Sequence, residues 1–361
     1  MNANFWYKKR VLVTGHTGFK GAWLCLWLQK MGADILGFSL PPSSKSNLFE
    51  MACVDKGMAS ILADIRNFER LCIEVKEFKP EIIIHMAAQA LVLESYKSPV
   101  NTYSTNIMGT VNILEASRMS DSVKVVINVT TDKCYENKEW FWGYRENEAM
   151  GGWDPYSSSK GCSELVTSAY RNSFFNPSEF NNKHSVVIST ARAGNVIGGG
   201  DWSENRLIPD ILDAYNKNEM LAIRNPSSIR PWQFVLEPLG AYLELAEKMY
   251  ESGIEYGQAW NIGPQDNDVQ TVGWIVERMS EFFEKKIKRR IDGGNENHEA
   301  MYLKLDTSKI KSKLCWEPKV KLIDALQLIV EWNRRFTNGE SPRLVSEDQI
   351  DHYMSLMKDK R

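Results

Sequence analysis

A tyrosine and a lysine four positions apart are the residues best suited to redox chemistry. Tyr156 and Lys160 follow Pro155, a residue that favours the first turn of a helix. On a helix, the i, i+4 spacing places both side chains on one face, about one turn apart. A nearby positive charge favours the phenolate of a tyrosine, so Tyr156 could remove a proton from a hydroxyl group. Surface helices often show the same spacing, so the function of Tyr156 and Lys160 has to be judged from the neighbouring elements of the sequence.

A second polar group follows an apolar run at residues 123–129. Thr131, Asp132 and Lys133 should lie at the carboxyl end of that predicted strand, where open α/β sheets bind ligands. A carboxyl group shielded from water has a raised pKa, which suits Asp132 to donate a proton. Lys133 would need burial or a positive neighbour to act as a base; otherwise it stays charged and stabilises developing negative charge. The alternative is a surface ion pair, worth on the order of 1 kcal/mol.

Three glycines join the first predicted strand, residues 11–14, to the helix predicted over residues 20–31. Gly15 would permit a tight turn, Gly18 would let the backbone approach a pyrophosphate, and Gly21 would allow close helix packing. The helix N-terminus offers unpaired N–H groups to phosphates. This arrangement predicts dinucleotide binding.

Strands and helices alternate through the first half of the chain. The predicted elements are strands at 11–14, 35–39, 82–85, 123–129 and 186–190, with helices at 20–31, 68–78 and 106–117. This alternation predicts an α/β fold with a Rossmann-type doubly wound parallel sheet. After about residue 192 the alternation stops, and loops and helices at 207–215 and 239–250 predict a smaller mixed α/β substrate lobe. We expect residues 1–191 and 234–262 in the cofactor domain, 192–233 and 263–345 in the substrate lobe, and 346–361 as a peripheral helix or tail.

Composition excludes several classes of protein. The formal net charge is −2 and no long run of like charges occurs, which argues against a nucleic-acid partner. The sequence contains no apolar stretch of about 18 residues, so we expect no membrane-spanning helix. The six cysteines lie far apart without C-x-x-C spacing, so we expect no metal site and interpret them as buried thiols in a reducing, cytoplasmic compartment.

The G-x-x-G-x-x-G spacing resembles the extended short-chain dehydrogenase/reductase family, and the resemblance implies NAD as cofactor. It assigns cofactor contacts to Gly15, Thr17, Gly18, Phe19, Lys20, Gly21, Asp64, Ile65, Ala87, Ala88, Gln89, Asn106, Tyr156 and Lys160. For Asp64 the alternative is a helix N-cap before Phe68. The second strand ends at Ser39 and Leu40, without the carboxylate that usually binds the adenosine ribose. We see no arginine directly after it for the extra phosphate of NADP, so we expect loosely held NAD.

The Asp132-Lys133 pair narrows the resemblance to sugar-nucleotide 4,6-dehydratases, which commonly carry Asp-Glu at this point. Lysine in the second position is a feature that resembles the CDP-glucose 4,6-dehydratases. The same resemblance is carried by segments 16–21, 132–135, 139–146, 151–152, 192–202 and 230–233. The resemblance covers about residues 5–335. It implies oxidation at C4 of CDP-glucose, loss of water across C5 and C6, and return of the hydride to C6, giving a precursor of deoxysugars such as those of O-antigen.

The same resemblance assigns roles to individual residues. Catalytic roles fall to Thr131, Asp132, Lys133, Tyr156 and Lys160, and substrate contacts to Thr131, Asn195, Arg206 and Arg230. Arginine suits a diphosphate because its planar fork pairs two oxygens. The preference for cytosine rests on the resemblance alone.

Two other functions remain open. A 4-epimerase would need the tyrosine and the cofactor but not the Asp-Lys pair, and a cofactor-sensing scaffold would show no turnover. Helices at 106–117 and 158–175 occupy the places where members of the family form a four-helix interface, so we expect a homodimer or homotetramer.

Overall fold

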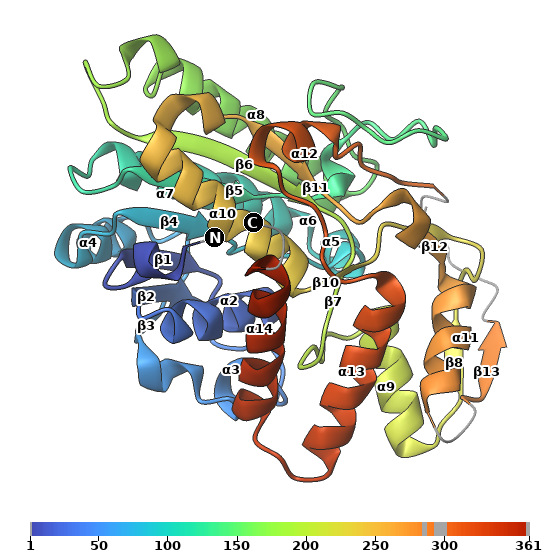
Figure 1. Cartoon of the computed structure of the whole chain (residues 1–361). Helices are drawn as coiled ribbons and strands as arrows, with labels where there is room; N and C mark the ends of the chain where they lie inside the picture. Colours follow the sequence, from blue (N-terminus) through green and yellow to red (C-terminus); the bar gives the residue numbers. More distant parts are fainter. Residues whose placement is uncertain (1, 284–286, 292–301, 359–361) are drawn as a thin grey trace.

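Seven parallel strands form the central sheet of the computed structural model, which describes residues 2–283, 287–291 and 302–358. The strand order is β11-β6-β5-β4-β1-β2-β3 (Figure 1). The strands are β1 Arg10–Thr14, β2 Asp34–Ser39, β3 Ala59–Leu62, β4 Ile82–His85, β5 Val125–Val129, β6 Val187–Ala193 and β11 Ala259–Ile262. The order reverses between β1 and β4, so a cleft opens there at the carboxyl edge of the sheet. The predicted doubly wound parallel sheet is confirmed.

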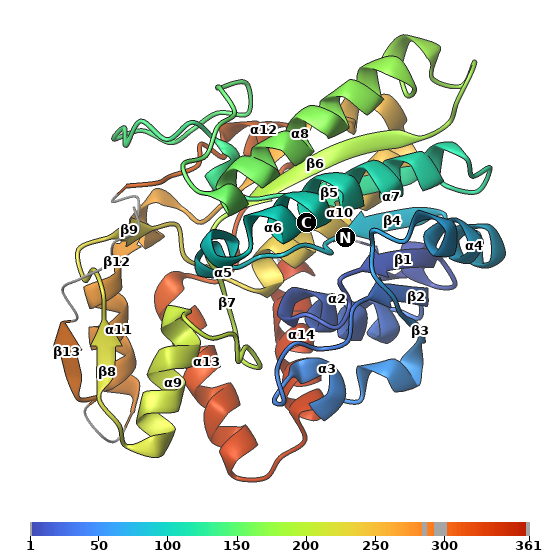
Figure 2. The same cartoon turned by 180° about the vertical axis from the view of Figure 1, so that it is seen from behind.

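Successive side chains of each strand are buried under different helices because they point to opposite faces of the sheet. In β1, Val11 and Val13 pack with α2 Phe19–Lys30, α10 Leu236–Ser252 and α14 Pro342–Lys358. The intervening Leu12 joins the core formed with α4 Phe68–Phe78, α7 Gly109–Arg118 and α8 Pro155–Ser173. Figure 2 shows the α4, α7 and α8 layer toward the viewer. Burial on both faces explains why these strands read as continuous apolar runs.

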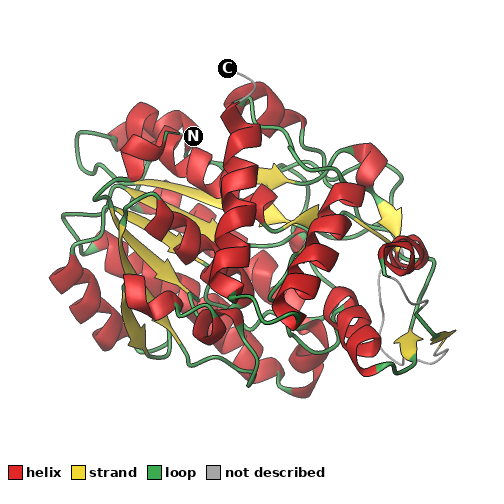
Figure 3. Ribbon diagram, turned by 60° about the horizontal axis from the view of Figure 1, so that its bottom comes forward, coloured by secondary structure: helices red, strands yellow, loops and turns green. Residues whose placement is uncertain are grey.

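Helices beside the sheet enclose a second core (Figure 3). It is formed by α9 Leu207–Lys217, α11 Val272–Phe282, one side of α13 Leu322–Thr337 and the strand β8 Leu221–Ile223. Strand β8 pairs with β13 Arg289–Ile291, whose side chains are exposed. Helix α13 joins the two cores, because Trp332 packs into the first while Leu326 and Ile329 pack into the second. The division into a cofactor domain and a substrate lobe at the expected boundaries stays a prediction.

Three local features differ from the sequence-based picture or complete it. Residues 106–117 do not form one regular helix: a π-helical turn, Ser104–Met108, precedes α7. The segment 346–358 belongs to α14, whose Val345, Ile350 and Tyr353 are buried in the first core; residues 359–361 lie outside the described part. Cys315 is exposed, so the interpretation of all six cysteines as buried thiols is wrong. Among the described residues no helix is long and apolar enough to cross a membrane.

Candidate active site

A cleft of about 1440 Å³ opens at the carboxyl edge of the sheet and is lined by both cores. It brings together nearly all the residues that the sequence singled out. These are Gly15, Thr17, Gly18, Phe19, Lys20, Gly21, Asp64, Ile65, Ala87, Ala88, Gln89, Thr131, Asp132, Lys133, Tyr156, Lys160, Asn195, Arg206 and Arg230. Only Asn106 of the expected set lies outside it.

Asn106 is buried behind the cleft and holds two elements together. Its Oδ1 accepts the backbone N–H of Gln89 at 2.8 Å, and its Nδ2 donates to the hydroxyl of Ser159 at 2.8 Å. The residue therefore fastens the loop after β4 to α8, the helix that carries Tyr156. Asn106 lies in the π-helical turn and is buried, so its expected cofactor contact stays a prediction while its hydrogen bonds give it a positioning role.

The glycine turn has the geometry that a pyrophosphate requires. Gly15 has φ +75°, and a Cβ there would lie 2.8 Å from backbone atoms of Met86 and Ala87. At Gly21 a Cβ would lie 2.1 Å from the carbonyl oxygen of Gly15, so only glycine lets α2 approach the turn. Gly18 is the N-cap of α2 and provides no side-chain cap, which leaves the first N–H groups of the helix available to an anion.

The end of β2 offers hydroxyl groups in place of a carboxylate. The hydroxyl of Thr17 lies 2.9 Å from that of Ser39 and donates to the carbonyl of Leu40 at 2.8 Å. Asp64 pairs with Arg66, whose hydrogen bond lowers the pKa of the Asp64 carboxyl. The alternative role of Asp64 as N-cap of α4 is wrong, because Asn67 caps that helix by accepting from the N–H of Arg70 at 3.1 Å.

Tyr156 and Lys160 lie on the first two turns of α8, which is capped by Asp154 through the N–H of Ser157. Lys160 donates from Nζ to the carbonyl of Val129 at 3.1 Å, and burial lowers its pKa to about 8. Burial raises the pKa of Tyr156 to about 12, although the Thr131 side chain acts in the opposite direction. The expected lowering of the Tyr156 pKa is therefore not found within the protein itself, because burial dominates and the cation that opposes it is Arg206. A cation brought by a ligand would favour the phenolate.

Thr131 lies two residues beyond the end of β5 and caps a short 3-10 helix, Asp132–Cys134. Asp132 is only 1% exposed, so the alternative of a surface ion pair with Lys133 is wrong. Its Oδ1 accepts from the Thr131 hydroxyl at 2.9 Å, whereas its buried Oδ2 has no hydrogen-bond partner among the described residues. Burial raises the pKa of the Asp132 carboxyl. Lys133 is half-buried and lines the same cleft.

The cleft wall also carries the three polar residues expected to face the substrate. Arg206 precedes α9 and pairs with Asp201 at 3.2 Å, while its side chain stays 35% exposed. Arg230 is buried and donates to the carbonyl of Ile229 at 2.9 Å. Asn195 also lines this wall. The two guanidinium groups make it suited to a diphosphate.

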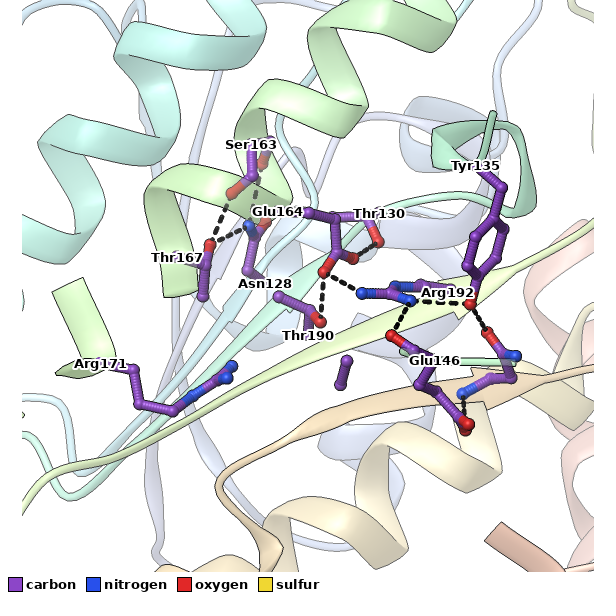
Figure 4. Close-up of polar contacts among 12 residues, drawn as sticks. Asn128, Thr130, Tyr135, Glu146, Ser163, Glu164, Thr167, Arg171, Thr190 and Arg192 are labelled. Atoms are coloured by element: carbon purple, nitrogen blue, oxygen red, sulfur yellow. Dashed lines mark hydrogen bonds and ion pairs between the residues drawn. The ribbon is translucent and has the colours of Figure 1, made fainter. Parts of the chain in front are cut away.

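Sequence reasoning missed a buried ion pair behind the catalytic residues. Glu164 and Arg192 lie 2.7 Å apart, with side chains 4% and 5% exposed (Figure 4). A signal existed in the sequence, because Glu164 follows Lys160 at the same i, i+4 spacing that relates Lys160 to Tyr156. Arg192 was noted only as the first residue of a segment that resembles the family. Its pairing with Glu164 could not be predicted, because the two residues are distant in the sequence.

A parallel doubly wound sheet with a glycine turn and a Tyr-Lys pair at its carboxyl edge defines an extended short-chain dehydrogenase/reductase. Within that class, the chain belongs to the GDP-mannose 4,6-dehydratase family, whose model matches residues 12–329. It is 52% identical over 355 residues to the CDP-glucose 4,6-dehydratase of Salmonella typhimurium, covering 98% of this chain and 99% of that protein.

Solved structures share the fold at lower identity. The UDP-glucose 4-epimerase of Thermotoga maritima with UDP-glucose has a TM-score of 0.78 and 23% identity, covering 91% of this chain and 99% of that one. The dTDP-glucose 4,6-dehydratase of Bacillus anthracis in complex with NAD has a TM-score of 0.74 and 23% identity, covering 93% and 99%.

Proposed function

We propose that the protein is an NAD-dependent hydro-lyase that converts CDP-glucose to CDP-4-keto-6-deoxyglucose and water. The observation that carries the proposal is the joint presence, in one cleft, of Tyr156 with Lys160 and of a buried Asp132 followed by Lys133. An oxidoreductase needs only the first pair, whereas loss of water also needs an acid and a base. The relative that is 52% identical over nearly the whole chain supports CDP-glucose as substrate.

The residues around the glycine turn fit NAD. The uncapped N-terminus of α2 and the close turn at Gly15 suit its pyrophosphate, and the hydroxyls of Thr17 and Ser39 suit a ribose. Asp64 and Ile65 would lie toward the adenine, while Lys160 would hold the nicotinamide ribose. When bound, NAD supplies the chemistry of accepting a hydride from C4 and returning it at C6.

Each side chain of the catalytic group has a separate task. Tyr156 takes the proton of the C4 hydroxyl, and the Thr131 hydroxyl beside it orients that group. Asp132, whose carboxyl pKa is raised by burial, donates a proton to the departing C6 hydroxyl through Oδ2. Lys133 removes the proton at C5, which the C4 ketone has acidified. Asn195, Arg206 and Arg230 bind the nucleotide diphosphate.

One incubation series tests this function. The purified protein is given NAD and, separately, CDP-, dTDP-, UDP- and GDP-glucose, and the products are analysed by mass. We expect loss of water from CDP-glucose, with deuterium at C4 reappearing at C6 and no net NADH. Stoichiometric release of NADH, or no loss of water from any of the four, would contradict the proposal.

The second candidate is a nucleotide-sugar 4-epimerase. The observation in its favour is the high TM-score against an epimerase structure, together with the Tyr-Lys pair that both reactions use. An epimerase product keeps the mass of the substrate, so the same mass measurement separates the two. The buried acid Asp132 favours the dehydratase, because epimerisation eliminates nothing.

We also propose that the protein forms a homodimer or homotetramer through α7 and α8. These helices lie side by side, and the exposed Met108 and Leu165 are large apolar side chains on this layer. Sedimentation of the wild type and of Leu165→Glu tests this, since a charge at a helix interface should weaken it. A cytoplasmic location is proposed from the six cysteines, all of which are free thiols.

A further inference from the structure

The short segment that carries Asp132 and Lys133 is anchored at both ends to the Glu164–Arg192 ion pair (Figure 4). On its N-terminal side, the hydroxyl of Thr130 donates to Oε1 of Glu164 at 2.5 Å. On its C-terminal side, Nη1 of Arg192 donates to the hydroxyl of Tyr135 at 2.7 Å. The proposed acid and base therefore lie between two hydrogen bonds to one buried pair.

The two members of the pair belong to different elements. Glu164 lies on α8, one turn beyond Lys160 and two turns beyond Tyr156, whereas Arg192 lies on β6. The second carboxylate oxygen of Glu164 accepts both Nη2 of Arg192 at 2.7 Å and the hydroxyl of Thr190 at 2.8 Å. The pair thus connects the helix that bears the redox residues to the segment that bears the acid and the base.

Further contacts stiffen the far end of this connection. The hydroxyl of Tyr135 donates to Oδ1 of Asn261 on β11 at 2.6 Å, and Arg192 also donates to the carbonyl of Glu146 at 3.0 Å. Near α8 the segment is tightly packed, because a Cβ on Gly161 would lie 3.3 Å from the carbonyl of Cys134. The segment can therefore move relative to α8 only if the pair or its anchors give way.

The redox residues have anchors of their own that the pair does not provide. The N-terminus of α8 is held by the Asp154 cap and by the bond between Ser159 and Asn106, and Lys160 is bonded to Val129. Within the described part of the chain, the Asp132 carboxyl accepts one side-chain hydrogen bond, from its neighbour Thr131. Loss of an anchor should therefore displace the acid and base while Tyr156 stays in place.

We propose that Glu164 and Arg192, with Thr130 and Tyr135, form a positioning unit that sets Asp132 and Lys133 at the distance from Tyr156 that elimination requires. The unit acts on elimination more strongly than on oxidation. This inference rests on the proposed function and adds to it a buried ion pair, Glu164 and Arg192, that lies outside the lining of the cleft. Burial opposes ionisation of Glu164. Arg192 and the hydroxyls of Thr130 and Thr190 nevertheless bring the pKa of Glu164 below its usual value.

The test removes one anchor at a time and leaves the ion pair intact. Tyr135→Phe deletes the C-terminal anchor and Thr130→Val the N-terminal one, with Thr130→Ser as the conservative variant that restores the hydroxyl. Tyr144→Phe is the matched control, because Tyr144 stacks on Tyr135 but donates its hydroxyl to Asn137. Single-turnover experiments with CDP-glucose follow oxidation by the transient absorbance of reduced cofactor, and elimination by loss of water.

We expect Tyr135→Phe and Thr130→Val to slow elimination by on the order of tenfold to a hundredfold, with oxidation changed about twofold or less. Reduced cofactor should then accumulate, Thr130→Ser should regain elimination, and Tyr144→Phe should match the wild type. Equal slowing of both steps, or a lower Tm with unchanged partition between them, overturns the positioning role. If the wild type removes no water from any nucleotide sugar, the proposed function itself is overturned. The wild type is therefore assayed before any variant is made.

Discussion

The hydroxyl of Thr131 donates to one oxygen of the Asp132 carboxyl at 2.9 Å, and the other oxygen is buried without a partner among the described residues. An unpaired buried oxygen is costly unless it is protonated or a ligand bonds to it. Burial raises the pKa of the Asp132 carboxyl, which is the direction that a proton donor requires. The pair therefore leaves one oxygen of a cleft-lining carboxyl without a hydrogen bond from the described residues.

Asp132→Asn should block loss of water while leaving the earlier steps. Asparagine keeps the shape and the bond to Thr131, but it cannot supply a proton. We expect exchange of the C5 proton with solvent deuterium to continue and formation of the 4-keto-6-deoxy product to fall by a factor on the order of 10² to 10⁴. Exchange is measured by NMR and product by mass. Undiminished loss of water would remove Asp132 from the acid role.

Lys133 is tested by two substitutions that separate its basicity from its charge. Lys133→Met removes both the basicity and the charge. Lys133→Arg keeps the positive charge but not the basicity, because arginine stays protonated at working pH. If Lys133 is the base, exchange of the C5 proton stops in both variants while oxidation at C4 persists. Exchange that survives in Lys133→Arg shows instead that the lysine stabilises the enolate as a cation. Undiminished exchange in Lys133→Met excludes both roles.

Tyr156→Phe should abolish oxidation without harming the fold. The phenol proton acceptor is lost, so we expect turnover to fall by a factor on the order of 10² to 10⁴. The apparent Tm should change by no more than about 2 °C, because the ring and its packing remain. Tyr170→Phe is the matched control on the same helix; its hydroxyl contacts Glu115, away from the cleft. A fully active Tyr156→Phe variant would contradict the mechanism.

The purified protein should carry or bind NAD in preference to NADP. The end of β2 presents the Thr17 and Ser39 hydroxyls rather than a carboxylate, and nothing after it supplies an arginine for a 2′-phosphate. We expect NAD to bind more weakly than in relatives with the carboxylate, and NADP at least about tenfold more weakly than NAD. Isothermal titration with both cofactors measures this. Full occupancy by NADP would show the expectation to be wrong.

A buried glutamate far from the cleft should make stability depend on pH. Glu237 on α10 accepts from the backbone N–H of Val320 at 2.6 Å and from the Tyr353 hydroxyl at 2.8 Å, and burial raises its pKa from 4.5 to about 7. Between these two values the folded chain holds a proton that the unfolded chain has lost. The stability contributed by the group is therefore present at low pH and is lost as pH rises through this window.

The comparison with Glu237→Gln isolates this effect. The free energy of unfolding of the wild type minus that of Glu237→Gln should fall by roughly 2 kcal/mol between pH 5 and pH 8. Urea denaturation at the two pH values measures the difference. Glu251→Gln, an exposed site on the same helix, should show no such change. A difference that stays constant or rises with pH would refute the assignment to Glu237.

Local patterns were enough to determine the fold class and most of the cleft. Apolar runs with turns between them are visible one strand at a time, and the glycine spacing marks the join between β1 and α2. The strand β3 escaped notice because it lies at the sheet edge, where Ala59 and Leu62 are exposed and no apolar run is required. The Tyr-Lys pair was readable because an i, i+4 relation is contained within one helix.

Contacts between segments distant in the sequence were decided only by the tertiary structure. Asp132 is buried next to the residue that follows β6, since a Cβ on Gly194 would lie 3.0 Å from its Oδ2. Asn106 lies buried in a π-helical turn. The local sequence pattern predicted a regular helix there. Arg192 finds Glu164 because β6 lies beneath α8 in the folded chain. Sequence periodicity reports which face of an element is buried, but the partner of a buried charge is set by three-dimensional packing.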